Sequence, residues 1–141
     1  MKSLLTDTNI VIDLLAKRAP FYMDAVALFS MADKKLLKLS VSALTFANTN
    51  YILLKVKTHD EARAILRKFK LLADVLPLDA KIVDLALNDK DFTDFEDALQ
   101  YYNAIENNLD AIITRNLKDF KKSKIPVMTA EQYIKNEPLK D

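Results

Sequence analysis

The chain has 141 residues, half of them hydrophobic, and a formal net charge of +1. It is therefore long enough to bury a core, and it has no overall charge that would draw it onto nucleic acid. It contains no cysteine and no glycine, which excludes disulfides, thiolate zinc sites, cysteine nucleophiles and Gly-rich phosphate loops. The one histidine, His59, has no evident partner, which removes Ser-His-Asp and histidine-based zinc chemistry. No apolar run is long enough to cross a bilayer and no secretory signal precedes the first predicted strand, so we expect a cytoplasmic protein without membrane contact.

The first half of the chain alternates short apolar runs with segments of helical periodicity. Leu4 and Leu5 predict a strand that ends at Asp7, and Asp7 or Thr8 can cap the helix that follows. The further elements expected here are a helix over residues 10–15, a helix over 21–34, a strand within 36–41, a helix over 42–54 that Ser42 can cap, and a helix reaching about residue 69 that Thr58 and Glu61 open with a capping box.

The second half continues the same alternation. The expected elements are a strand over 74–78, a helix from Asp79 to about 88, a polar loop over 88–94, a helix over 95–106, a strand over 110–114, a turn over 115–120, a strand over 125–128 and a helix around Tyr133 that a second capping box opens at Thr129. Because strands alternate with helices, the chain predicts a three-layer α/β domain with a parallel sheet of about five strands. We expect residues 1–135 to form one domain and 136–141 a frayed tail. Without glycine, left-handed turns are expected to use Asn or Asp, as at residues 107–108.

Polar residues follow the carboxyl ends of the predicted strands. They are Asp7 and Asn9 after the first strand, Ser42, Thr45 and Asn48 after the second, Thr114, Asn116 and Asp119 after the fourth, and Asp94, Glu96 and Asp97 at the start of the helix before that strand. In a doubly wound sheet these positions meet along one edge. Clustered carboxylates repel one another unless a cation holds them, and Mg²⁺ is bound by a few carboxylates and water. Such an ion can activate water and stabilise charge on a phosphoryl group.

Four segments, in order along nearly the whole chain, resemble the PIN-domain family. They are residues 7–9 (DTN), 42–45 (SALT), 97–100 (DALQ) and 114–116 (TRN) with Asp119-Phe120. Residues 95–100 (FEDALQ) look especially like one bacterial branch of the family. The resemblance implies a nuclease that depends on Mg²⁺ or Mn²⁺ and acts mostly on RNA. Many small bacterial members of the family are toxins of toxin–antitoxin pairs.

Carried over residue by residue, the resemblance implies roles for the site residues. Asp7, Asp97 and Asp119 would be the catalytic, metal-binding acids, with Asp94 as a helper. Asn116 lies near a place where other members carry Asp, and Asn48 stands where the family usually has Glu. Both amides could add metal contacts.

The proposed chemistry is metal-assisted hydrolysis of a phosphodiester. Thr114, Arg115 and Asn9 would contact the substrate, since Arg suits bidentate phosphate contact. Ser42 and Thr45 would order waters of the metal shell, or Ser42 would only cap its helix.

The resemblance also implies partners. These are RNA, a cognate antitoxin that fills the acidic groove with Arg or Lys, and a second copy of the chain. The apolar hairpin over residues 10–32 could supply the dimer face or be ordinary core. Two other functions stay open: a PIN domain weakened by Asn48 that binds RNA or protein without cutting, and an unrelated phosphotransfer or phosphatase domain with Asp7 as nucleophile. Asn9 and the lack of a clear lysine lower the last.

Overall fold

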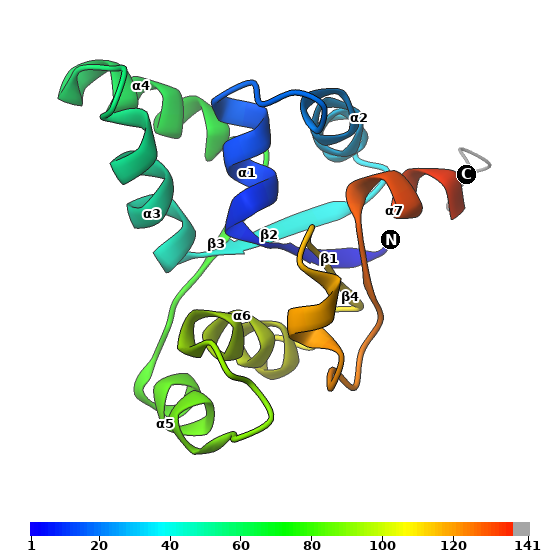
Figure 1. Ribbon diagram of the computed structural model, residues 1–141. Helices are drawn as coiled ribbons and strands as arrows, with labels where there is room; N and C mark the ends of the chain where they lie inside the picture. Colours follow the sequence, from blue (N-terminus) through cyan, green and yellow to red (C-terminus); the bar gives the residue numbers. More distant parts are fainter. Residues whose placement is uncertain (137–141) are drawn as a thin grey trace.

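A parallel sheet lies at the centre of the computed structural model, which describes residues 1–136. Its strands are β1 (Ser3–Thr6), β2 (Lys38–Ser42), β3 (Asp74–Leu76), β4 (Ala111–Ile113) and β5 (Val127–Met128), in the order β3-β2-β1-β4-β5. All four strand pairs run parallel, and β1 lies in the middle (Figure 1). The predicted α/β fold with about five parallel strands is confirmed.

Helices cover both faces of this sheet. They are α1 (Thr8–Leu15), α2 (Tyr22–Asp33), α3 (Ala43–Leu53), α4 (His59–Phe69), α5 (Ala80–Asn88), α6 (Phe95–Glu106), the 3₁₀ helix η1 (Leu117–Phe120) and α7 (Ala130–Asn136). One buried cluster joins α1, α2, α4 and α7 to the sheet, and a second joins α5, α6 and η1 to its other face. Figure 1 shows this division, with α5 and α6 on the side opposite α1, α2 and α7.

The burial of both faces of β1 explains why its sequence is a continuous apolar run. Leu4 and Leu5 are both fully buried, yet Leu4 packs with α1 and α2 while Leu5 packs with α5 and α6. Neighbouring strand residues point to opposite faces, and both faces of this parallel sheet are covered. Register pairs Leu4 with Leu39 and with Ala111, so the carboxyl ends of β1, β2 and β4 lie side by side.

The predicted helix starts are confirmed by their caps. Thr58 and Glu61 form the capping box of α4. Thr129 and Gln132 exchange the two hydrogen bonds of a second box, Thr129 N to Gln132 Oε1 and Gln132 N to Thr129 Oγ1, both 3.0 Å. Asp79 Oδ1 accepts from Ile82 N at 3.0 Å. Local side-chain chemistry therefore fixes where these helices begin.

Left-handed turns depart in part from the prediction. Asn108 takes a φ of 55° after α6, as expected, but Lys17 (φ 53°) and Lys35 (φ 61°) also adopt this conformation. Both lysines are exposed. An unbranched side chain in solvent tolerates the left-handed region at a cost of about 1–2 kcal/mol, so the expectation that Asn or Asp would fill every such turn is wrong.

The apolar residues of the hairpin over 10–32 are mainly core. Ile10, Val11, Leu28 and Phe29 are 0–2% exposed within the first buried cluster, so the ordinary-core alternative holds for them. Of the predicted tail over 136–141, Asn136 ends α7 and the rest lies outside the described residues. Within residues 1–136, no helix has the length and apolar character needed to cross a membrane.

Candidate active site

An acidic cavity of about 250 Å³ opens at the carboxyl ends of the strands. Its lining is rich in polar groups: Asp7, Thr8, Asn9, Ile12, Arg18, Asn48, Asp94, Glu96, Asp97, Gln100, Asn116 and Asp119. Seven of the residues predicted for the site are therefore gathered here: Asp7, Asn9, Asn48, Asp94, Asp97, Asn116 and Asp119. Thr114 and Arg115 are not in its lining. We call this space the acidic cavity.

Asp7 is the most buried carboxylate of the cavity, at 6% exposure. Its Oδ1 accepts from the backbone N of Thr8 at 2.8 Å, which makes Asp7 the cap of α1 as well. Its Oδ2 accepts from the Thr114 hydroxyl at 2.7 Å. Burial raises the pKa of Asp7 above its usual range, although these two hydrogen bonds oppose the shift. Asp7 therefore caps α1 and lines the acidic cavity at the same time.

Asp97 is a second carboxylate of the cavity whose pKa is raised. Burial, followed by repulsion from neighbouring carboxylates, raises its pKa to about 7. The neighbours that contribute are, in decreasing order, Asp94, Asp7, Asp119 and Glu96. Near neutral pH the Asp97 carboxyl is therefore protonated in about half of the molecules, unless a nearby cation stabilises its charge.

The donor set of the cavity suits a hard divalent cation, because carboxylate and amide oxygens are what such ions prefer. As the side chains stand, no three acidic or histidine residues within residues 1–136 are close enough to hold a metal ion between them. Mg²⁺ usually binds through one or two carboxylates and keeps several waters, which this spacing allows. Gln100, also in the lining, has a buried carbonyl oxygen, Oε1, without a hydrogen-bond partner among the described residues.

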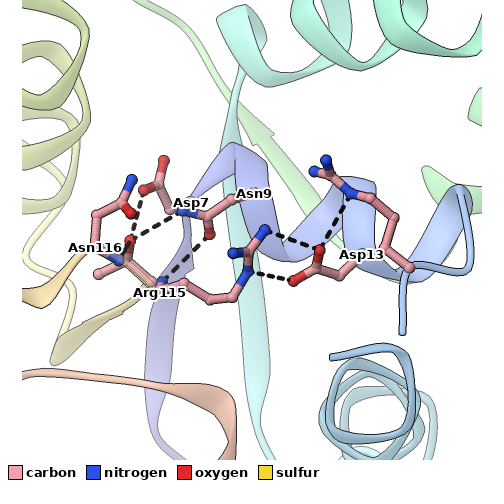
Figure 2. Close-up of polar contacts among 7 residues, drawn as sticks. Asp7, Asn9, Asp13, Arg115 and Asn116 are labelled. Atoms are coloured by element: carbon pink, nitrogen blue, oxygen red, sulfur yellow. Dashed lines mark hydrogen bonds and ion pairs between the residues drawn. The ribbon is translucent and has the colours of Figure 1, made fainter. Parts of the chain in front are cut away.

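A polar network joins the end of β4 to the start of α1. Thr114 is fully buried, and its hydroxyl, besides donating to Asp7, accepts from Asn116 N at 3.0 Å and from Asn9 Nδ2 at 3.4 Å. Asn9 Oδ1 in turn accepts from the backbone N of Arg115 at 3.4 Å. The contacts therefore run from Asn116 through the Thr114 hydroxyl to Asn9, and from Asn9 to Arg115. Figure 2 draws them with Asn9, Arg115 and Asn116 labelled. Because Thr114 is buried and donates to Asp7, its position favours a role in orienting Asp7 over direct contact with a substrate.

The side chain of Arg115 is directed away from the acidic cavity by Asp13. Its Nε and Nη2 donate to the two carboxylate oxygens of Asp13 at 2.8 and 3.1 Å (Figure 2). Its guanidinium also lies over the Phe21 ring, 4.0 Å from the centroid. Arg115 lines a separate cavity of about 410 Å³, whose walls include residues of α1, α2 and α7. This placement does not favour the phosphate contact expected of its side chain.

A second polar cluster joins α1, α3 and α6 beneath the cavity. The Thr8 and Thr45 hydroxyls lie 2.8 Å apart, and Gln100 Nε2 donates to both at 3.3 Å. Thr45 is fully buried, so it holds the helices together rather than facing a metal shell. Ser42 Oγ accepts from Thr45 N at 3.4 Å, which is the cap that the sequence allowed for.

Sequence reasoning missed three residues of this region. Asp13 is a carboxylate inside the apolar run over residues 10–15, and that interruption was the available signal. Arg18 lies in the break after α1 and lines the acidic cavity. Gln100 ends the segment over residues 97–100 that resembles the PIN family, but the resemblance implies no role for it.

The fold and this edge of carboxylates define an α/β domain with an oxygen-rich site at its strand ends. A comparison with known protein families matches residues 3–118 to the PIN domain. The chain belongs to the PIN domain family, so the resemblance noted in the sequence is confirmed. PIN domains are generally nucleases and typically use divalent metals.

Solved structures with the same fold include toxin–antitoxin proteins. VapBC-1 from nontypeable Haemophilus influenzae has a TM-score of 0.68 at 20% identity, covering 93% of this chain and 99% of that one. A toxin–antitoxin complex from Klebsiella pneumoniae has a TM-score of 0.63 at 25% identity, covering 90% and 97%. VapC20 of Mycobacterium tuberculosis, described as a sarcin–ricin loop cleaving toxin, has a TM-score of 0.61 at 15% identity, covering 77% and 86%. A search of curated proteins finds no significant match to the sequence.

Proposed function

We propose that this chain is a Mg²⁺- or Mn²⁺-dependent endoribonuclease and the toxin of a toxin–antitoxin pair. One observation carries the proposal: Asp7, Asp97 and Asp119, which come from distant parts of the sequence, line one cavity in a PIN domain. Burial and, after it, the neighbouring carboxylates raise the pKa of Asp97 to about 7, so ionising this side chain near neutral pH costs the fold stability. A bound cation would offset that cost.

The residues that line the cavity would have different roles in metal binding and substrate contact. Asp7, Asp97 and Asp119 would hold the ion, one or two of them directly and the rest through its bound water. Asp94, Asn48 and Asn116 would complete its surroundings directly or through water. When bound, the ion would lower the pKa of a coordinated water and offset charge on the phosphodiester. Thr8 and Thr114 hold both oxygens of Asp7 in a fixed orientation, so Asp7 need not reorganise when an ion or substrate arrives. Asn9 is tied to Thr114 and faces the same cavity, where it would contact the substrate.

The proposal includes partners and location. The Haemophilus and Klebsiella structures are toxin–antitoxin assemblies, and we propose that an antitoxin covers the acidic cavity of this chain with basic side chains. We also propose that the chain works in the cytoplasm, as a homodimer, with residues 1–135 as its single domain. RNA is the proposed substrate because one structure of the same fold belongs to an RNA-cleaving toxin.

The test is cleavage of a mixed RNA panel with Mg²⁺, with Mn²⁺ and with EDTA. Wild-type protein should cut only with metal, and Asp7→Asn should abolish cutting. Asp84→Asn is the matched control, because Asp84 is an exposed acid of α5 outside the acidic cavity. Cutting that survives both EDTA and Asp7→Asn would contradict the proposal.

A binding-only module is the second candidate, and Asn48 is the observation that favours it. Asn48 lines the acidic cavity and cannot supply the charge of the Glu usual in the family. Folded protein that binds RNA or a partner but cuts nothing with either metal would support this candidate over the nuclease. Restored cutting in Asn48→Glu would identify the lost charge as the reason.

A further inference from the structure

We infer that Arg18 contacts a backbone phosphate of the RNA at the acidic cavity. This assignment rests on the proposed function, because it names how the same site would recognise its polyanionic substrate. Arg18 lies in the short break between α1 and α2, where the sequence carries no motif that would indicate a role.

The first argument is electrostatic. Five carboxylates line the cavity, those of Asp7, Asp94, Glu96, Asp97 and Asp119, and Arg18 is the single basic side chain among the described residues that line it. An RNA phosphate that approaches this wall meets like charges, each worth about 1 kcal/mol at 4 Å in water and several-fold more near a protein surface. A cation fixed at the cavity wall offsets part of that repulsion in addition to any bound metal.

The second argument is that the guanidinium of Arg18 is held at one end and open at the other. Its Nε lies 3.4 Å from Asp13 Oδ1, and the side chain is 43% exposed. Among residues 1–136 this is the one ion pair or hydrogen bond of that guanidinium, so its Nη groups keep the paired N–H donors that match a phosphate. Backbone bonds fix the loop as well, from Arg18 N to Asp13 O at 3.1 Å and from Phe21 N to Arg18 O at 3.0 Å.

The third argument is that the other arginine near the site is already engaged. Arg115 uses Nε and Nη2 on Asp13, stacks on Phe21 and lines the other cavity. Asp13 is 1% exposed and binds both arginines, so the cluster has one net positive charge. Arg18 presents that charge to the acidic cavity.

The experiment measures the affinity of a short fluorescein-labelled single-stranded RNA, drawn from the cleavage panel, over a range of salt concentrations. Ca²⁺ replaces Mg²⁺ as the hard cation, and a gel confirms that the RNA stays intact. Arg18→Ala should raise Kd roughly tenfold, the loss expected for one charge-assisted hydrogen-bonding group. It should also make the slope of log affinity against log salt shallower by about 0.7, the value for one phosphate contact with a single strand.

Three variants make the result specific. Arg18→Lys should keep the wild-type salt slope because it keeps the charge, and Arg18→Gln repeats the test if Arg18→Ala does not fold. Arg67→Ala removes an exposed arginine of α4 outside the cavity and should change neither quantity. An unchanged Kd and slope in Arg18→Ala, an equal loss in Arg67→Ala, or no RNA binding by wild type would each overturn the inference.

Cleavage is scored separately in Mg²⁺ and Mn²⁺. Wild-type protein that binds RNA through Arg18 but cuts nothing would contradict the nuclease and support the Arg18 contact. Metal-dependent cutting with no effect of Arg18→Ala on binding would do the reverse.

Discussion

Asn48 stands where the resemblance to the PIN family implies a Glu, so the difference that we propose for this cavity is one of charge. It is half-buried in the cavity lining, so its side chain is placed to reach an ion or an ion's water. An amide oxygen supplies a dipole where a carboxylate supplies a full charge. Cation affinity in oxygen-ligand sites follows the count of charged ligands, and the cavity should therefore bind metal more weakly than a site with Glu at this position.

Asn48→Glu should tighten Mn²⁺ binding by roughly tenfold, equivalent to about 1.4 kcal/mol. Titration calorimetry or the electron paramagnetic resonance signal of free Mn²⁺ would measure the affinity. Asn50→Glu is the matched control, because a residue two positions along a helix faces another direction and Asn50 is outside the cavity lining. Equal affinities in wild type and Asn48→Glu would remove Asn48 from the surroundings of the ion.

The raised pKa of Asp97 makes stability depend on pH when metal is removed. Its pKa of about 7 in the folded protein exceeds the ordinary value of 3.8, so the folded state binds the proton more tightly than the unfolded chain. The contribution of this group to stability is therefore present at low pH and is lost as pH rises from about 4 to about 7. Because Asp97 is only half-buried, solvent screening reduces the effect to about 1 kcal/mol.

Asp97→Asn should remove this dependence. In EDTA, its free energy of unfolding relative to wild type should rise by about 1 kcal/mol between about pH 4 and about pH 8, as measured by urea denaturation. Asp84→Asn, on the exposed face of α5, should show no such pH-dependent difference. A difference from wild type that is the same at both pH values would show that Asp97 titrates normally.

At the scale of elements, Asp13 links α1 to the turn after β4 and to the loop before α2. Its buried carboxylate binds Arg115 just after β4 and Arg18 in the loop before α2. A buried carboxylate is tolerated in an apolar helix face only when it is paired in this way. Because Arg18 and Arg115 are each partly exposed, water can solvate them when the carboxylate is neutralised.

Asp13→Asn should therefore cost about 2 kcal/mol of unfolding free energy, less than breaking a fully buried pair. A double-mutant cycle with Arg115→Ala tests the cause, because the two changes remove the same contact and should be clearly non-additive. Chemical denaturation of the four proteins gives the coupling. Additive losses would show that Asp13 acts through something other than Arg115.

The elements were predictable because their signals are local. Capping residues, apolar alternation and helical spacing lie within a few positions of one another, as at Thr58 and Glu61 or at Leu4 and Leu5. Asp7, Asn48, Asp97 and Asp119 could also be placed at one edge, because parallel strand ends converge whatever the details of packing.

The direction of Arg115 was not predictable in the same way. Its partner Asp13 lies 102 residues earlier, and which of two cavities a side chain enters depends on the turn after β4. Arg18 differs in the opposite way, because it lines the acidic cavity although the sequence did not predict it there. It lies in a break that carries no motif, and only the folded loop brings it to the acidic cavity.

At the scale of the whole molecule, a net charge of +1 conceals an uneven distribution. Five carboxylates line one cavity, so the fold contains a local charge repulsion that the near-zero net charge does not reveal. A ligand that binds the native state and not the unfolded chain stabilises by RT ln(1 + [L]/Kd). Thermal stability should therefore report ion binding without reference to any RNA.

Saturating Mn²⁺ should raise the melting temperature. At a hundredfold excess over Kd the gain is about 2.7 kcal/mol, or roughly 8 °C for a domain of this size, and EDTA should reverse it. Asp119→Asn should shrink the Mn²⁺-induced rise, since it removes a ligand, while its melting temperature without metal should equal or exceed that of wild type because one repelling charge is gone. The exposed acid in Asp84→Asn provides the reference. Equal Mn²⁺-induced rises in wild type and Asp119→Asn would mean that the ion binds elsewhere. A smaller Mn²⁺-induced rise in Asp119→Asn, together with a higher melting temperature without metal, would place both the charge repulsion and the ion that offsets it in the acidic cavity.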